Sequence, residues 1–215
     1  MENKKNWGEI IVKTFAILFG IAIISVLAYG IMIFAAFGMF DKYYTPSELV
    51  ENFDNKKAEI YQLKNFFKTI VPTNTEVEIE FDGDDIAWIH VKSIGRQKTN
   101  DVVEFDRRDL EVGSPNTDSL ISRIGWDEKI LNTLKDKLDN ANCTSISSGE
   151  PAKIGFKRSG LVMYSFNVFD RPMNDSVRKQ YVDACTYRYV NKRLILEFGG
   201  GAVGAQCFLS QSSTQ

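Results

Sequence analysis

The strongest hydrophobic pattern in the chain is an unbroken apolar segment near its start. Residues 14–40 contain 27 positions without a charged side chain. About 20 apolar residues span a bilayer core as a helix. A buried core helix is rarely apolar on all sides over such a length, and a cleaved signal peptide normally has an apolar core of about 7–15 residues. We therefore predict an uncleaved transmembrane helix over residues 14–40, in contact with membrane lipid.

Basic residues beside this segment predict its orientation. Three lysines precede it: Lys4, Lys5 and Lys13. Lys42 is the one basic residue within the fifteen positions that follow it. Because basic flanks stay in the cytoplasm, we expect residues 1–13 to form a cytoplasmic tail and residues 41–209 to form an exterior domain. Ala16 and Gly20 have the small-xxx-small spacing that lets two helices approach closely, so a homodimer is an alternative to a monomer.

The spacing of apolar residues predicts a long helix soon after the membrane segment. Thr45, Pro46 and Glu48 have the pattern of a helix start, with a capping threonine, a proline in the first turn and a glutamate three residues after the cap. Apolar residues then recur on one side of the helix: Leu49, Phe53, Ile60, Leu63, Phe67 and Ile70. Pro72 is expected to end it.

Strict alternation of polar and apolar residues predicts a β-hairpin next. Residues 75–81 form the first strand, residues 82–85 a turn and residues 86–92 the returning strand. A shift of register by one residue would turn glutamates toward the core. The expected apolar pairs are Phe81 with Ala87, Ile79 with Ile89 and Val77 with Val91. The expected polar pairs on the other face are Glu76 with Lys92 and Glu78 with His90.

The second half of the chain predicts one more main helix and a run of strands. Residues 102–105 are a candidate third strand, and the turn residues 113–116 mark a candidate sub-boundary near 113–118. Residues 127–142 predict a helix with acids at its start and lysines near its end. Its apolar stripe contains Ile130, Leu131, Leu134, Leu138 and Ala141. Later strands are predicted over 144–147, 152–157, 161–169, 186–190, 193–198 and 205–209, with a short helix within 174–184.

This order of elements predicts an α+β fold. Runs of strands follow each helix instead of alternating with helices one by one, so we expect two main helices packed on a largely antiparallel sheet. The polar residues 210–215 are expected to form a flexible tail.

The stretch Gly199–Gly204 formally matches the phosphate-binding pattern G-x-G-x-x-G. A dinucleotide site also needs a helix after the glycines and an acidic residue about twenty positions later. Eleven residues follow Gly204 in the sequence, and none of them is acidic. We therefore expect a turn or bulge that joins two strands, with close approach of a peptide backbone or small ligand as the alternative. No cofactor is predicted.

Acidic residues on the hairpin offer a second candidate site: Glu76, Glu78, Glu80, Asp82, Asp84 and Asp85. Calcium binds clusters of oxygen atoms, but this spacing does not match an EF-hand loop, so a solvated strand face is favoured and no metal site is predicted. His90 is the only histidine, and a Ser–His–Asp or Cys–His catalytic set would have to include it. No nucleophile motif accompanies His90, so no catalytic residue is predicted.

Exposed aromatic residues predict a contact surface. Trp88 falls on the outer face of the hairpin, where it would meet a partner or a covering helix. We expect a surface at a sheet edge that binds a ligand or partner, formed by Trp88, Tyr187, Tyr189, Gly199, Gly200, Gly201 and Gly204.

The three cysteines are Cys143, Cys185 and Cys207. In an oxidising compartment, one disulfide and one free thiol is the simplest arrangement. Cys185 with Cys207 is one candidate pair. If residues 186–190, 193–198 and 205–209 form a simple meander, however, these cysteines lie at opposite ends of the middle strand, beyond the roughly 7 Å that a disulfide allows. The pairing therefore stays open, with three buried thiols as the alternative.

Three segments resemble a family of small Bacteroidota envelope proteins: residues 139–143 (DNANC), 149–160 (GEPAKIGFKRSG) and 196–208 (LEFGGGAVGAQCF, the GGGAVGxQCF motif). The resemblance covers roughly residues 120–208. It implies a bacterial envelope protein with its helix in the inner membrane and its exterior domain in the periplasm, and it implies no activity or site. Some members resemble lipoproteins, whereas this chain has no cysteine directly after its apolar segment.

Composition and charge narrow the classes of function. The net charge of −2 argues against nucleic-acid binding through a broad basic face. Three cysteines and one histidine are too few for a zinc site built mainly from those residues. We expect a single-pass membrane protein whose exterior domain binds a protein partner or supports envelope assembly, without catalysis. The alternatives are an envelope hydrolase that uses acidic residues with a bound ion, and a toxin-immunity or inhibitor protein.

Overall fold

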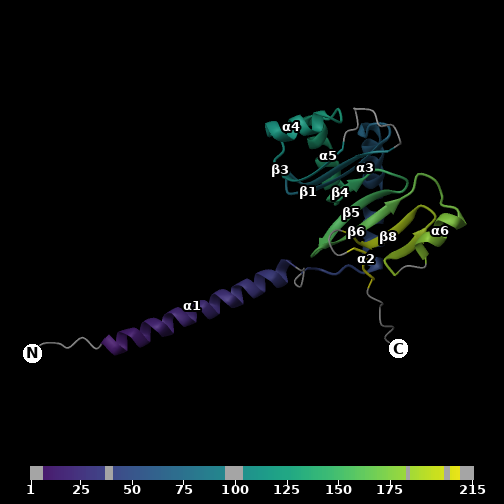
Figure 1. The fold of residues 1–215 in the computed structure, drawn as a ribbon. Helices are drawn as coiled ribbons and strands as arrows, with labels where there is room; N and C mark the ends of the chain where they lie inside the picture. Colours follow the sequence, from purple (N-terminus) through teal and green to yellow (C-terminus); the bar gives the residue numbers. More distant parts are fainter. Residues whose placement is uncertain (1–6, 37–40, 95–103, 183–184, 201–203, 209–215) are drawn as a thin grey trace, which may run out of the picture. The chain divides into compact units, whose positions relative to one another are not determined.

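The computed structural model describes residues 7–36, 41–94, 104–182, 185–200 and 204–208. The chain divides into two compact units between Lys42 and Tyr43. Figure 1 shows the fold of each unit. Residues 1–6 and 209–215, which include the first six residues of the predicted cytoplasmic tail and all of the predicted flexible tail, lie outside the described residues.

The first unit contains a single long helix, α1 (Trp7–Ala36). Its stretch Ile11–Ala35 is 25 residues long and unburied in this structure, and Lys13 is its one charged residue. At 1.5 Å per residue this stretch is long enough to cross a bilayer core. A signal sequence near the N-terminus can pass the same test of length and composition, so the helix by itself establishes only that the chain carries a membrane-compatible segment.

The helix predicted after this segment is present but broken into two. α2 (Pro46–Asn55) begins with the predicted capping box, in which Thr45 and Glu48 each accept from the other's backbone N–H. α3 (Lys57–Ile70) follows after Lys56, whose φ of −119° and ψ of 19° leave the helical region. Asparagine and aspartate crowd the end of α2 and favour non-helical backbone. The apolar stripe nevertheless keeps one side across the break, since Phe53 and Ile60 are both buried.

Eight antiparallel strands form one sheet among the described residues, in the order β3-β2-β1-β4-β5-β6-β8-β7. The first meander consists of β1 (Thr75–Asp82), β2 (Asp85–Ser93) and β3 (Phe105–Leu110). The second consists of β4 (Ser145–Ser147), β5 (Ala152–Ser159) and β6 (Val162–Val168), followed by β7 (Tyr187–Asn191) and β8 (Leu194–Gly199). The two meanders run outward in opposite directions from the central pair of β1 and β4.

The hairpin register is confirmed over most of its length. Val77 pairs with Val91, and Glu78 pairs with His90 on the other face. Toward the turn, Phe81 pairs with Ile86 and not with the predicted Ala87, because a bulge after Glu80 admits an extra residue on β2. The candidate third strand also needs correction: residues 102 and 103 lie outside the described part, and β3 begins only at Phe105.

Three further helices complete the described fold. α5 (Glu128–Asn140) confirms the second predicted helix, and Asp127 caps it by accepting from the N–H of Ile130. α6 (Asp175–Val182) lies within the predicted short helix. α4 (Pro115–Ser122) was not predicted, because the residues around Gly113 resemble a turn. Ser114 caps this helix, so the candidate sub-boundary near 113–118 falls at a helix start and stays a prediction.

One hydrophobic core joins α2, α3 and α5 to the sheet. Its buried members include Phe53, Leu63 and Leu134 from the helices and Ile79 and Phe166 from the strands. Figure 1 shows α3 and α5 along the same face of the sheet. A smaller cluster lies on the opposite face at the β8–β7 end, where α6 packs over Ile195 with Phe169 and Met173. Helices therefore leave the other end of that opposite face uncovered among the described residues.

Candidate functional site

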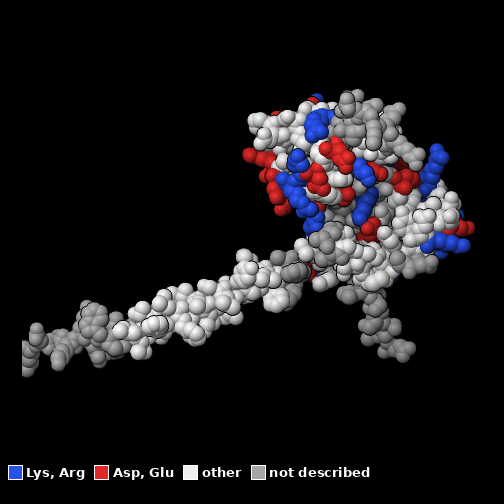
Figure 2. Space-filling model, viewed as in Figure 1, with Lys and Arg blue, Asp and Glu red and all other residues white. Residues whose placement is uncertain are grey.

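The uncovered part of the sheet is charged. We call it the open face and define it by these side chains: Glu78, Glu80, Trp88, His90, Lys153, Arg158 and Glu197. Along β1 the glutamates alternate with buried Val77, Ile79 and Phe81, so the polar positions all point away from the core. Figure 2 shows acidic and basic side chains interspersed where Figure 1 places β1, β4 and β5.

Ion pairs across strands organise the open face. Arg158 on β5 donates through Nε and Nη2 to both carboxylate oxygens of Glu80 on β1. Lys153 Nζ lies 2.7 Å from Glu197 Oε1, and Asn167 Nδ2 donates to the other carboxylate oxygen at 2.9 Å. The side chains of Glu80 and Glu197 are only 9% and 13% exposed. These acids are therefore held in fixed positions, which favours a surface with a defined charge pattern.

Glu78 lies between these two ion pairs. Burial raises the pKa of its carboxyl group above the ordinary value, opposed by the nearby positive charge of Lys153 and by His90. Glu80 and Glu197 add to the rise because they are like charges. A carboxylate in this setting gains from a cationic or hydrogen-bond-donating group on a partner, because such a group offsets the desolvation of the charge.

Trp88 and His90 extend the open face toward β3. Their rings stack with centroids 5.9 Å apart. Trp88 Nε1 donates to Asp106 Oδ1 at 2.7 Å, and the guanidinium carbon of Arg108 lies 5.9 Å from the indole centroid. Side chains from β3 therefore hold the indole in place, and Trp88 is partly exposed. In the described part of the chain, residues of β3 contact Trp88, and not the expected covering helix.

The structure separates the aromatic residues that the sequence grouped on one surface. Trp88 is on β2, next to one edge strand, whereas Tyr187 and Tyr189 are on β7, the opposite edge strand. With neighbouring strands about 4.8 Å apart, roughly six strand spacings lie between them. Tyr187 packs against Tyr181 of α6, with ring centroids 4.9 Å apart. Tyr189 is 37% exposed and lies beneath Arg178.

The glycine-rich stretch makes a tight return next to β8. Gly199 has φ of +146° and Gly200 φ of +97°, which favour glycine. A Cβ on Gly199 would lie 3.0 Å from the Cα of Ala205, so the returning chain needs the missing side chain. Gly204, with φ of +69°, completes the return, and Gly201 lies outside the described residues. The predicted strand over 205–209 is reduced to a single bridge between Gly199 and Ala205.

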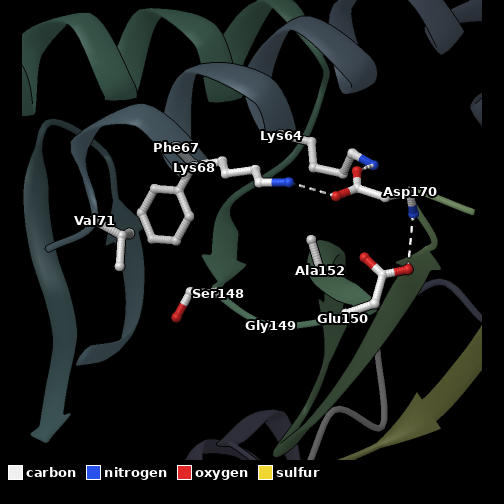
Figure 3. A pocket seen from close by; sticks show the side chains of 9 residues that line it. All are labelled: Lys64, Phe67, Lys68, Val71, Ser148, Gly149, Glu150, Ala152 and Asp170. Carbon is white, nitrogen blue, oxygen red and sulfur yellow. Dashed lines mark hydrogen bonds and ion pairs between the residues drawn. The ribbon is translucent and has the colours of Figure 1, made fainter. Parts of the chain in front are cut away.

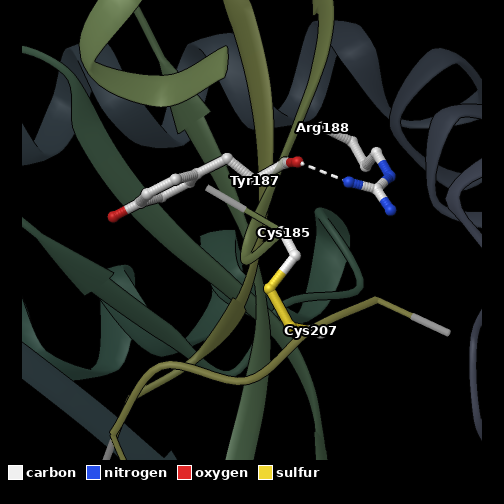
Figure 4. Close-up of a disulfide and its surroundings, with 4 residues drawn as sticks. All are labelled: Cys185, Tyr187, Arg188 and Cys207. Carbon is white, nitrogen blue, oxygen red and sulfur yellow. Dashed lines mark hydrogen bonds between the residues drawn. A yellow bond between two sulfur atoms is a disulfide. The ribbon is translucent and has the colours of Figure 1, made fainter. Parts of the chain in front are cut away.

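A disulfide joins Cys185 and Cys207, with Cα atoms 4.7 Å apart (Figure 4). A simple meander would have placed the two cysteines too far apart, with the chain after β8 on the side of β8 away from β7. That side is already occupied by β6. The returning chain therefore lies on the same side of β8 as β7. The N–H of Phe208 donates to the carbonyl of Cys185 and fixes this approach. Cys143 is a free, buried thiol, and burial raises its pKa to about 12.

A pocket of about 250 Å³, which sequence reasoning did not find, lies beside α3 (Figure 3). It is lined by Lys64, Phe67, Lys68, Val71, Ser148, Gly149, Glu150, Ala152 and Asp170. Asp170 accepts from the ammonium groups of Lys64 and Lys68, and these hydrogen bonds lower its pKa to about 2. Its own N–H donates to Glu150 at 2.9 Å. These residues are far apart in the sequence, so no local motif marks the site.

The acidic hairpin does not assemble a metal site within the described residues, where no group of three His, Cys, Asp or Glu side chains is close enough to hold an ion. Glu80 instead pairs with Arg158, and Asp85 accepts from the N–H of Val112. The sequence favoured a solvated strand face, and part of that face is instead a network of ion pairs and hydrogen bonds within the chain.

Comparison of the chain with protein families, with curated proteins and with solved structures finds no match. The resemblance to a family of Bacteroidota envelope proteins accordingly stays a prediction.

Proposed function

We propose that this chain is a single-pass inner-membrane protein whose exterior, periplasmic domain binds a protein partner through the open face of the sheet. The observation that carries the proposal is the open face itself: an area that no described helix covers, with fixed ion pairs, a half-buried carboxylate and a partly exposed indole. Tryptophan and arginine are enriched at the energetic centres of protein interfaces. Fixed charges of both signs favour a partner of complementary pattern.

Two features support the proposed membrane topology. The apolar stretch Ile11–Ala35 is about twice as long as the core of a signal peptide. The Cys185–Cys207 disulfide suits an oxidising compartment outside the cytoplasm. Both agree with the excess of lysines before the helix, which favours a cytoplasmic N-terminus.

Photocrosslinking in cells tests the proposal directly. A photoreactive amino acid replaces Trp88 in the full-length protein with a tag after Gln215, and a matched variant carries it at Tyr189 on the opposite edge strand. We expect one dominant protein adduct from position 88 and none from position 189. Adducts from neither position, or from position 189 alone, would contradict the assignment of the open face.

A second pair of variants checks that the contact matters. Trp88→Ala should remove the partner from a pull-down after chemical crosslinking, because the partly exposed indole is lost. Tyr189→Ala should retain it, since that side chain lies about six strand spacings away. The identity of the captured protein then distinguishes an assembly factor from a toxin bound by its immunity protein.

A further inference from the structure

The pocket beside α3 lies on the helix-covered side of the sheet, apart from the open face. α3 supplies Lys64, Phe67 and Lys68, and the connection between β4 and β5 supplies Gly149 and Glu150. Pockets for drug-sized ligands measure about 300–1,000 Å³. A pocket of about 250 Å³ therefore suits a smaller molecule.

One side of the pocket presents positive charge. Lys64 and Lys68 share the single carboxylate of Asp170, so the three groups together keep one positive charge. The Lys64 side chain is 6% exposed, and its ammonium group has three N–H donors of which Asp170 takes one. Lys68 is 72% exposed, and its ammonium group points toward Asp170 (Figure 3). An anionic group of a ligand can accept from both ammonium groups.

Glu150 supplies a negative charge next to Asp170. Glu150 accepts the N–H of Asp170 through Oε1, and a carboxylate has further acceptor sites on both oxygens. Glu150 also lines an adjoining hollow together with Asp170 and Arg171. The four charged groups around the pocket, Lys64, Lys68, Asp170 and Glu150, sum to zero. A ligand with no net charge but with both charge signs matches this arrangement better than a simple anion or cation.

The remaining wall is apolar and open. Phe67, Val71 and Ala152 supply carbon surface. Gly149 has φ of +138°, and a Cβ there would lie 3.3 Å from the carbonyl oxygen of Pro151. A side chain at this position is therefore disfavoured, which keeps the wall free.

We propose that this pocket binds a small zwitterion with an apolar side chain, as found in a free amino acid or a short peptide. The ligand's carboxylate lies against Lys64 and Lys68, its ammonium group against Glu150 and its side chain against Phe67 and Val71. The proposal is independent of partner binding at the open face.

Calorimetric titration of the full-length protein in detergent micelles tests the proposal with four probes. We expect saturable binding of L-leucine or of the dipeptide leucyl-glycine, and the tighter of the two identifies a free amino acid or a peptide as the source. Leucinamide lacks the carboxylate and N-acetyl-leucine lacks the ammonium group. Each should bind about tenfold more weakly or worse, because one charge-assisted contact is lost.

Matched variants assign the binding to the pocket. Lys68→Gln and Glu150→Gln should each weaken leucine binding about tenfold, while Lys57→Gln and Glu51→Gln, which alter exposed charges on the same pair of helices, should not. Circular dichroism checks that each variant folds. Absence of saturable binding by both zwitterions, or equal binding by the wild type and the pocket variants, would overturn the proposal. Neither result would affect the crosslinks expected from position 88.

Discussion

Arg158 and Glu80 are joined by two hydrogen bonds although 78 residues separate them in the chain. The pair links β5 to β1 over the short strand β4, so it crosses the boundary between the two meanders. The Glu80 side chain is 9% exposed, whereas the Arg158 side chain is 44% exposed. The Glu80 carboxylate has therefore lost most of its contact with water, and the hydrogen bonds from Arg158 replace that contact.

Removing Arg158 should destabilise the unit formed by Tyr43–Gln215. We expect Arg158→Met to lower the free energy of unfolding by about 1.5–3 kcal/mol, because a buried carboxylate loses two charge-assisted donors. Urea unfolding of the full-length protein in detergent, followed by tryptophan fluorescence, measures the change. The control is Arg107→Met on exposed β3, for which a change within about 0.5 kcal/mol is expected. Equal losses in both variants would show that the pair contributes nothing specific.

Replacing Glu78 should stabilise the domain at neutral pH. Its folded-state pKa is raised, chiefly by burial, so the folded state binds the proton more tightly than the unfolded state. Stability therefore falls as pH rises from the ordinary value of 4.5 through the folded pKa. Glu78→Gln should exceed the wild type in stability at pH 7, and the difference should shrink below about pH 4.5. Unfolding curves across this range measure it, with Glu76→Gln as the exposed control. A wild type that is more stable than Glu78→Gln at pH 7 would contradict the expected sign of the stability difference.

Asp170 should show the opposite dependence. Its pKa is lowered from 3.8 to about 2 by the ammonium groups of Lys64 and Lys68. Its contribution is fully present above pH 3.8 and is lost as pH falls toward 2. Because Asp170 is one-third exposed, we expect Asp170→Asn to cost only about 1 kcal/mol at pH 7. Thermal unfolding of the wild type and of Asp170→Asn at pH 7 and near pH 2 measures this cost. A stability difference between the two proteins that is the same at both pH values would contradict the ion pairs as its source.

The disulfide should contribute measurably to stability. The cysteines are 22 positions apart, and a closed loop of this length corresponds to about 3 kcal/mol in the chain-entropy treatment. The double variant Cys185→Ser with Cys207→Ser should lose this amount in urea unfolding. Cys143→Ser offers a comparison without loss of a cross-link.

Thiol labelling with mass detection gives an independent check of the cysteines. The native protein should take up no label, because Cys143 is buried and its pKa is about 12. Unfolding without reductant should expose one thiol, and unfolding with reductant three. Labelling of three thiols without reductant would exclude the disulfide.

Local patterns were enough to predict much of the fold. Strict alternation along residues 75–81 determined the facing of the hairpin, and the Thr45–Glu48 capping box marked a helix start. The break at Lys56 was not predicted, because the apolar stripe continues across it. The helix after Ser114 was missed because glycine, serine and proline also favour turns.

The candidate sites depended on long-range contacts that a single sequence does not reveal. Asp170 meets Lys64 across 106 positions, and neither residue belongs to a recognisable motif. Trp88 and Tyr187 both look exposed and aromatic, yet the strand order places them near opposite edges. The approach of Cys185 to Cys207 likewise depends on β6 having taken the far side of β8, which periodicity does not indicate.

The central position of β1 and β4 has a consequence for how the protein is made. β1, β2 and β3 are complete once residue 110 has been synthesised, but β1 then has one unpaired edge until β4 arrives at residues 145–147. An unpaired strand edge is a template for aggregation. Between these two points of synthesis the edge of β1 is therefore open to pairing with other chains, and the three-residue strand β4 closes it.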